Sequence, residues 1–189
     1  MDKIEKRLKL DSRRNLRILL GSYDGYPLFQ SLCGHLFEAW VLEVIERGGF
    51  FNSREILHAN NTNQPSETII RLESSSRLIV DTIQPDQQIK QLHVPNDRNF
   101  AGGLDAWIPG FGAFQITVGQ THTIDKTVQN KLSQLGRGAN RLYWLLPSFR
   151  YNSWTKKTPF DIEQYAILIP TPSSVTDNPI VSLPWTIKV

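Results

Sequence analysis

Apolar side chains between residues 28 and 45 recur in pairs every four residues, the spacing of one broad face of an α-helix. The pairs are Leu28 with Phe29, Leu32 with Cys33, Leu36 with Phe37, Trp40 with Val41, and Val44 with Ile45. The glycine pair at 48–49 is typical of a helix end. So wide an apolar face must be covered by another layer, so this segment predicts a long helix packed on a core.

After residue 49 the pattern changes to alternating or short apolar runs, which indicate strands. We predict strands at 50–57, 68–74, 77–83, 104–109, 113–118, 141–147 and 165–170, and a short edge strand at 91–94. A tight serine-rich turn is expected to join the second and third. A further helix is predicted over 124–135 and one helical turn at 160–164. This order predicts an α/β (α+β) fold, a mixed β-sheet flanked by helices.

The positive charge is concentrated at the N-terminus. Residues 1–18 hold seven Lys or Arg and three Asp or Glu, a balance of +4, whereas the whole chain carries +3. We expect a basic helix or arm over 1–20 and a single domain over 21–189. Such an arm attracts nucleic-acid phosphates, although the same charges also suit a merely solvated helix.

Composition excludes several other classes. No apolar run is long enough to cross a membrane. The single cysteine, Cys33, cannot form an internal disulfide or a cysteine-based zinc site, which fits an intracellular location, nuclear or cytoplasmic. The chain contains neither GxxxxGK[ST] nor HExxH, and its four histidines share no metal-binding spacing.

Two polar residues lie within adjoining apolar segments. A hairpin over 104–118 that turns at Gly110 places Asp105 opposite Gln115. Alternation sends Asp105, Gln115 and Thr117 to one face, and Leu104 and Ala106 to the other. A solvated strand face explains this pattern, but a carboxylate beside an amide oxygen also suits a hard cation. The long helix offers a third ligand, with Glu38, Glu43 and Glu46 as candidates that spacing does not separate.

Four segments occur in a recognisable order: GHLFEAW (34–40), LDAWIPGFGAFQITVGQTHTI (104–124), NRLYWLLP (140–147) and DIEQYAILIP (161–170). Together they resemble the nuclease-like domain of Crinkler and retrotransposon-hot-spot (RHS) proteins, within the PD-(D/E)XK restriction-endonuclease-like superfamily. The similarity covers roughly residues 28 to 170. It implies a restriction-endonuclease-like fold and a metal-dependent nuclease that hydrolyses nucleic-acid phosphodiesters, with DNA as the expected partner. Relatives often carry an upstream NTPase module, so a further protein partner is also expected.

The resemblance assigns roles to individual residues. It implies Glu38, Asp105 and Gln115 as ligands of Mg²⁺ or Mn²⁺. The family's strand lysine is replaced by Thr117, so Lys126 or Lys131 would have to supply the cation. His122 would orient phosphate or water, with a helix-start hydrogen bond as its alternative role. The missing lysine also favours a second hypothesis, a catalytically inactive relative that binds nucleic acid or a protein partner.

The segment 149–157 interleaves aromatic and basic side chains, a composition that grips nucleic acid by stacking and charge. We expect most of its aromatic residues to be buried in the core, with the segment as a candidate for nucleic-acid contact. Its members are Phe149, Arg150, Tyr151, Trp154, Lys156 and Lys157.

Overall fold

The computed structural model describes residues 3–22, 30–56, 66–82, 91–97, 103–120, 141–155 and 162–172, with residues 122, 128, 130 and 132. The helices whose bounds fall within these residues are α1 (Lys3–Gly21), α2 (Gln30–Arg47) and α4 (Ser148–Tyr151). The strands are β1 (Gly49–Glu55), β2 (Glu67–Leu72), β3 (Arg77–Val80), β4 (Leu92–Pro95), β5 (Ala106–Ile108), β6 (Gly112–Ile116), β7 (Arg141–Leu146) and β8 (Glu163–Leu168).

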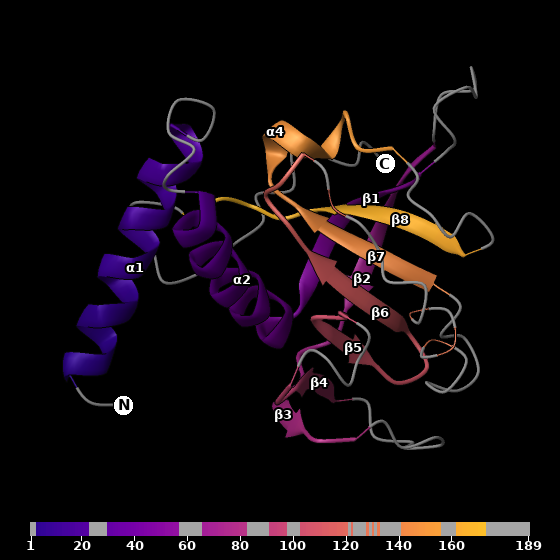
Figure 1. The fold of residues 1–189 in the computed structure, drawn as a ribbon, viewed down its shortest axis with the longest axis horizontal. Helices are drawn as coiled ribbons and strands as arrows, with labels where there is room; N and C mark the ends of the chain where they lie inside the picture. The colour runs from indigo at the N-terminus through magenta and orange to yellow at the C-terminus, as the bar shows by residue number, and fades with distance from the viewer. Residues whose placement is uncertain are drawn as a thin grey trace, which may run out of the picture.

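The strands form one mixed sheet in the order β2-β1-β8-β7-β6-β5-β4-β3. β6, β7 and β8 are parallel to one another, as are β3 and β4, while the remaining pairs are antiparallel. Figure 1 shows α2 against one face of this sheet, with α1 on its outer side. The predicted α/β class, with a mixed sheet flanked by helices, is confirmed.

Hydrophobic side chains cover both faces of the central strands. On the α2 face, Phe37 and Val41 pack in one cluster with Phe114 and Ile116 of β6. The opposite face carries a second cluster, which includes Trp144 of β7 and the helical residues Val128 and Leu132. Burial on both faces explains why β7 reads as an almost continuous apolar run.

The link between β2 and β3 differs from the predicted tight turn. The two strands stand at opposite ends of the sheet order, yet only residues 73–76 separate them. A link this short spans at most roughly 18 Å, whereas eight strands laid flat would separate their outer members by roughly 34 Å. The sheet must therefore curve enough to bring the end of β2 within roughly 18 Å of the start of β3.

The C-terminal end of α2 holds this link in place. The main-chain N–H of Ser75 and the hydroxyl of Ser74 both donate to the carbonyl of Glu46, at 3.0 Å each. Directly after α2, Gly48 has φ +70°, and a Cβ there would lie 2.6 Å from both the Leu72 oxygen and the Ser74 nitrogen. Only glycine lets the chain turn this closely beside the link.

Other boundaries also differ from expectation. β4 is not an edge strand, because it lies between β3 and β5. The predicted helical turn at 160–164 was wrong where it can be checked, since β8 begins at Glu163. Most of the predicted helix at 124–135 lies outside the described residues, although residues 128, 130 and 132 are helical. No helix of the described part of the chain is long and apolar enough to span a membrane.

His93 on β4 gives the fold a predictable pH dependence. The side chain is 2% exposed, its Nε2 has no hydrogen-bond partner among the described residues, and its ring lies 5.4 Å from that of Trp107. Burial lowers the pKa of His93 below the ordinary 6.5. The unfolded chain therefore binds this proton more readily, so stability is fully present above about pH 6.5 and is lost as the pH falls below it.

We expect His93→Phe to flatten this loss. Urea unfolding at about pH 7.5 and about pH 5 should show a smaller drop in unfolding free energy for the variant than for the native chain. His35→Gln, at an exposed position on α2, is the control and should keep the native drop. An unchanged pH dependence in His93→Phe would contradict the assignment.

Candidate active site

β5 and β6 form the predicted hairpin. Ala106 pairs with Phe114, Trp107 with Ala113 and Ile108 with Gly112, and Phe111 N–H donates to the Ile108 carbonyl at 3.0 Å across the turn. This register places Asp105 level with Gln115, as predicted from the sequence.

Asp105 and Gln115 meet in the interior of the domain. Each is 4% exposed, so the alternative of a solvated strand face is wrong. Gln115 Nε2 donates to Asp105 Oδ2 at 2.9 Å, and the main-chain N–H of Ile116 donates to the same oxygen at 2.6 Å. Hydrogen bonds to a carboxylate stabilise its charged form, so this pair can hold a negative charge in a buried position.

The chain bends where it reaches Asp105. Leu104 belongs to the cluster on the far face, whereas Ala106 packs on the α2 face, so the prediction that these two share a face was wrong. The Asp105 carboxylate takes the Ile116 N–H, a donor that the strand ladder would otherwise use. Asp105 therefore lies where β5 leaves regular pairing with β6.

Thr117, at the position where the resemblance implies lysine, is also buried. It is 9% exposed, and its Oγ1 accepts a hydrogen bond from Gly119 N–H at 3.0 Å. The hydroxyl thus shapes the loop that follows β6 and brings no positive charge.

The cationic residues proposed from the sequence, Lys126 and Lys131, lie outside the described residues. The structure places a different cation at this end of β6: Arg150 of α4, whose Nε donates to the Val118 carbonyl at 3.2 Å. The position of Arg150 could have been predicted from a parallel arrangement of β6 and β7, because the segments that follow parallel strands lie at the same edge of the sheet. The ring of His122 lies edge-on to that of Trp144, with ring centroids 5.5 Å apart.

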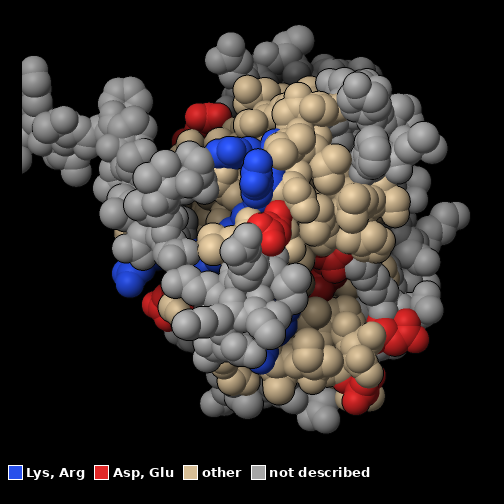
Figure 2. Space-filling model, turned by 90° about the vertical axis from the view of Figure 1, so that its left-hand side faces the viewer, with Lys and Arg blue, Asp and Glu red and all other residues tan. Residues whose placement is uncertain are grey.

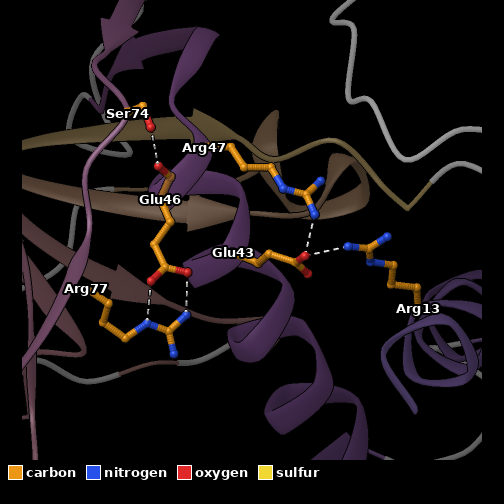
Figure 3. A network of polar contacts seen from close by, with 6 residues as sticks. All are labelled: Arg13, Glu43, Glu46, Arg47, Ser74 and Arg77. Atoms are coloured by element: carbon orange, nitrogen blue, oxygen red, sulfur yellow. Dashed lines mark hydrogen bonds and ion pairs between the residues drawn. The ribbon is translucent and has the colours of Figure 1, made fainter. Parts of the chain in front are cut away.

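The acidic residues of α2 separate into two groups. Glu43 forms ion pairs with Arg13 and Arg47, and Glu46 is held by Arg77 with contacts of 3.1 and 2.9 Å (Figure 3). Both are thus engaged in joining α2 to α1 and β3. A cavity of about 580 Å³ between α1 and α2 adjoins this network rather than Asp105.

Glu38 is the α2 acid to which the resemblance assigns the role of metal ligand. It is half-buried and lies one helical turn after Gly34, where a Cβ would approach Val118 Cγ2 to 4.0 Å. However, α2 covers the face of β6 that bears Phe114 and Ile116, and alternation directs Gln115 to the other face. The structure thus brings Asp105 and Gln115 together, while Glu38 remains a predicted ligand carried by the neighbouring helix.

The donor chemistry suits a magnesium ion. Within the part of the chain that the structure describes, no three His, Cys, Asp or Glu side chains cluster as a metal site. Mg²⁺ does not need such a cage, because it keeps several waters and binds through one or two carboxylates together with substrate phosphate. Asp105 and the Gln115 amide oxygen could supply part of this limited set, whereas Glu38 lies on the helix that covers the opposite face of β6.

The aromatic residues of 149–157 mainly serve the core. Tyr151 and Trp154 are 3% and 4% exposed, and their carbonyls accept hydrogen bonds from the buried Arg54 guanidinium. Burial raises the pKa of the Tyr151 hydroxyl to about 12. The expectation that most of these aromatic residues belong to the core is confirmed for Tyr151 and Trp154. Lys156 and Lys157 lie outside the described residues.

Comparison with known proteins assigns the chain to a family. The chain is 44% identical over 162 residues, 85% of its length, to Crinkler effector protein 15 and to Crinkler effector protein 16 of Phytophthora infestans. The chain carries a domain of the Crinkler family. The match spans 26% of each of these relatives, so this Crinkler domain corresponds to about a quarter of their length. No family model and no solved structure matches it.

Proposed function

We propose that this Crinkler domain is a metal-dependent nuclease of the PD-(D/E)XK type that hydrolyses phosphodiester bonds in DNA inside the cell in which the effector acts. The observation that carries the proposal is the buried contact of Asp105 with Gln115 across the β5–β6 hairpin, at 2.9 Å. A carboxylate and an amide at this position are costly to bury, and they match the strand residues that the superfamily uses.

In this proposal Asp105 and Gln115 would hold Mg²⁺ or Mn²⁺ on the hairpin. Glu38, on the helix that covers the opposite face of β6, is kept only as the ligand that the resemblance implies. The bound ion would polarise a phosphate oxygen and lower the pKa of a coordinated water. Rotation of the Gln115 amide would turn its oxygen toward the ion in place of the nitrogen that now contacts Asp105. Arg150, at the end of β6, is our candidate for the positive charge that Thr117 does not provide, beside Lys126, Lys131 and His122.

Exposed basic residues on α1 support nucleic acid as the partner. Lys9, Arg14 and Arg17 are exposed on this helix, and Figure 2 shows Lys and Arg side chains on the face that includes α1. Phosphate contacts of this kind release counterions, so binding should weaken steeply as salt rises.

The decisive experiment is plasmid nicking with Asp105→Asn. This change keeps the shape and an acceptor for Ile116 N–H, but it removes the charge that a metal ion needs. We expect Mg²⁺-dependent nicking by the native chain, no nicking in EDTA, and a loss of about 100-fold or more in Asp105→Asn. Asp81→Asn is the control, because Asp81 is exposed and accepts a hydrogen bond from the Asn96 amide at 3.0 Å, away from the β5–β6 hairpin.

Equal nicking by the native chain and Asp105→Asn would show that the activity comes from a contaminant, and the proposal would fail. Absence of nicking together with salt-dependent DNA binding would support the second candidate, a catalytically inactive module that binds nucleic acid. Thr117 favours this candidate, because its hydroxyl accepts a hydrogen bond from Gly119 N–H and it provides no positive charge in place of the lysine. Retention by a protein partner without DNA binding would instead support a protein-interaction module.

A further inference from the structure

β2 is the outermost strand at one end of the sheet. Among the described strands only β1 pairs with it, so its other side is an edge. An edge strand presents main-chain N–H and C=O groups that another strand can pair with. Its side chains add apolar surface: Ile69 is 58% exposed, and Phe50 on the adjoining β1 is 48% exposed.

The outward face of β2 carries three exposed residues of different chemistry. Glu67, Ile69 and Arg71 are two positions apart and therefore share a face. Arg71 pairs with Phe50 in the ladder, and its guanidinium lies over the Phe50 ring at 6.0 Å. An acid, an apolar residue and a base thus follow one another along an edge that no other described strand pairs with.

This order is complementary to itself. If two β2 strands pair antiparallel about a two-fold axis at Ile69, then Glu67 faces the partner's Arg71 and Arg71 faces the partner's Glu67. Ile69 lies opposite the partner's Ile69. Opposite charges directly across a strand pair are favourable, whereas like charges are unfavourable. A pairing shifted by one residue would lose both charge matches.

The edge at the other end of the sheet lacks this property. Arg77 of β3 is bound to Glu46 of its own chain, and the remaining β3 residues carry no acid that could face it. Ile79 on β3 is 56% exposed, about as much as Ile69, so exposure alone does not distinguish the two edges. The arrangement of charged residues distinguishes the β2 edge from the β3 edge.

We propose that the domain forms a two-fold symmetric dimer in which β2 pairs antiparallel with β2 of a second copy. The two sheets then continue into one another across the axis. Exposed ion pairs contribute about 0–1 kcal/mol each, so they fix the register more than they tighten the dimer. One strand pair buries less than the roughly 800 Å² per partner of a standard interface, so the dimer is weak and concentration-dependent.

Charge exchange tests this interface in the full chain. Glu67→Arg or Arg71→Glu alone would place like charges across the axis, whereas the double variant restores both matches. In sedimentation velocity over a concentration series, we expect each single variant to raise the apparent Kd by about ten-fold or more. The double variant should recover most of the native value.

A matched pair of surface variants locates the interface. Ile69→Lys should leave the chain monomeric, and Ile79→Lys, at a similarly exposed position on the other edge, should dimerise as the native chain does. Circular dichroism confirms that each variant is folded. A native chain that stays monomeric, single charge variants that dimerise normally, or loss of dimer in Ile79→Lys alone would each overturn the proposal.

Discussion

Gly48→Ala is expected to lower the free energy of unfolding by about 3–5 kcal/mol. The alanine would have to adopt a left-handed backbone conformation, and its Cβ would also clash with neighbouring atoms. The backbone at Gly48 has φ +70°, which costs a residue with a Cβ about 1–2 kcal/mol. The added Cβ would also lie 2.6 Å from main-chain atoms of Leu72 and Ser74. Backbone cannot move aside as a flexible side chain can, so α2 and the β2–β3 link would have to separate.

Gly110→Ala is the matched control for this effect. Gly110 has φ +78°, but nothing lies within 4 Å of a Cβ placed there. The variant should lose only the conformational term, about 1–2 kcal/mol. Urea unfolding at one pH measures both, and equal losses would show that the close packing of the link beside Gly48 contributes little.

Trp144→Ala is expected to cost about 3–5 kcal/mol, which is typical of removing a large buried aromatic side chain. Trp144 is fully buried, its ring lies 5.0 Å from that of Trp154, and its Nε1 donates to Gln164 Oε1 at 3.1 Å. Truncation would leave a cavity on the far face of the sheet and a buried Gln164 amide without this partner. Both effects destabilise the folded state.

Trp144→Phe separates these two contributions. It keeps an aromatic ring in the cluster but removes the N–H, so we expect a smaller loss of about 1–3 kcal/mol. The two variants are compared by urea unfolding under identical conditions. If Trp144→Phe is as damaging as Trp144→Ala, the hydrogen bond to Gln164 rather than packing is the main contribution.

Local patterns predicted the elements well. The paired apolar residues of 28–45 identified α2, because helical periodicity is a property of the segment itself. The register that brings Asp105 to Gln115 also followed from local sequence, since Gly110 and Gly112 place the turn. The same reasoning found the two residues that now form the centre of the candidate site.

Features that depend on distant partners were not predictable in this way. The serine-rich residues 73–76 read as a turn, because nothing in their composition distinguishes a hairpin from a crossing link. The hydrogen bonds that Arg54 donates to the carbonyls of Tyr151 and Trp154 likewise join residues 97 and 100 positions apart, so no local pattern predicts them. Leu104 and Ala106 lie on opposite faces of the sheet, and the Asp105 carboxylate between them takes the place of a main-chain acceptor for Ile116 N–H. The alternation of side chains along a strand does not predict this arrangement.

The short passage from β2 to β3 has a consequence for how the domain resists unfolding. Strands at the border of an open sheet can ordinarily peel away one at a time, with little effect on the opposite border. Here the two borders are consecutive along the chain and share an anchor at the end of α2. Detaching either border would pull on the other, so the whole sheet should melt as one cooperative unit, and β2 can stay ordered while presenting an open side to solvent.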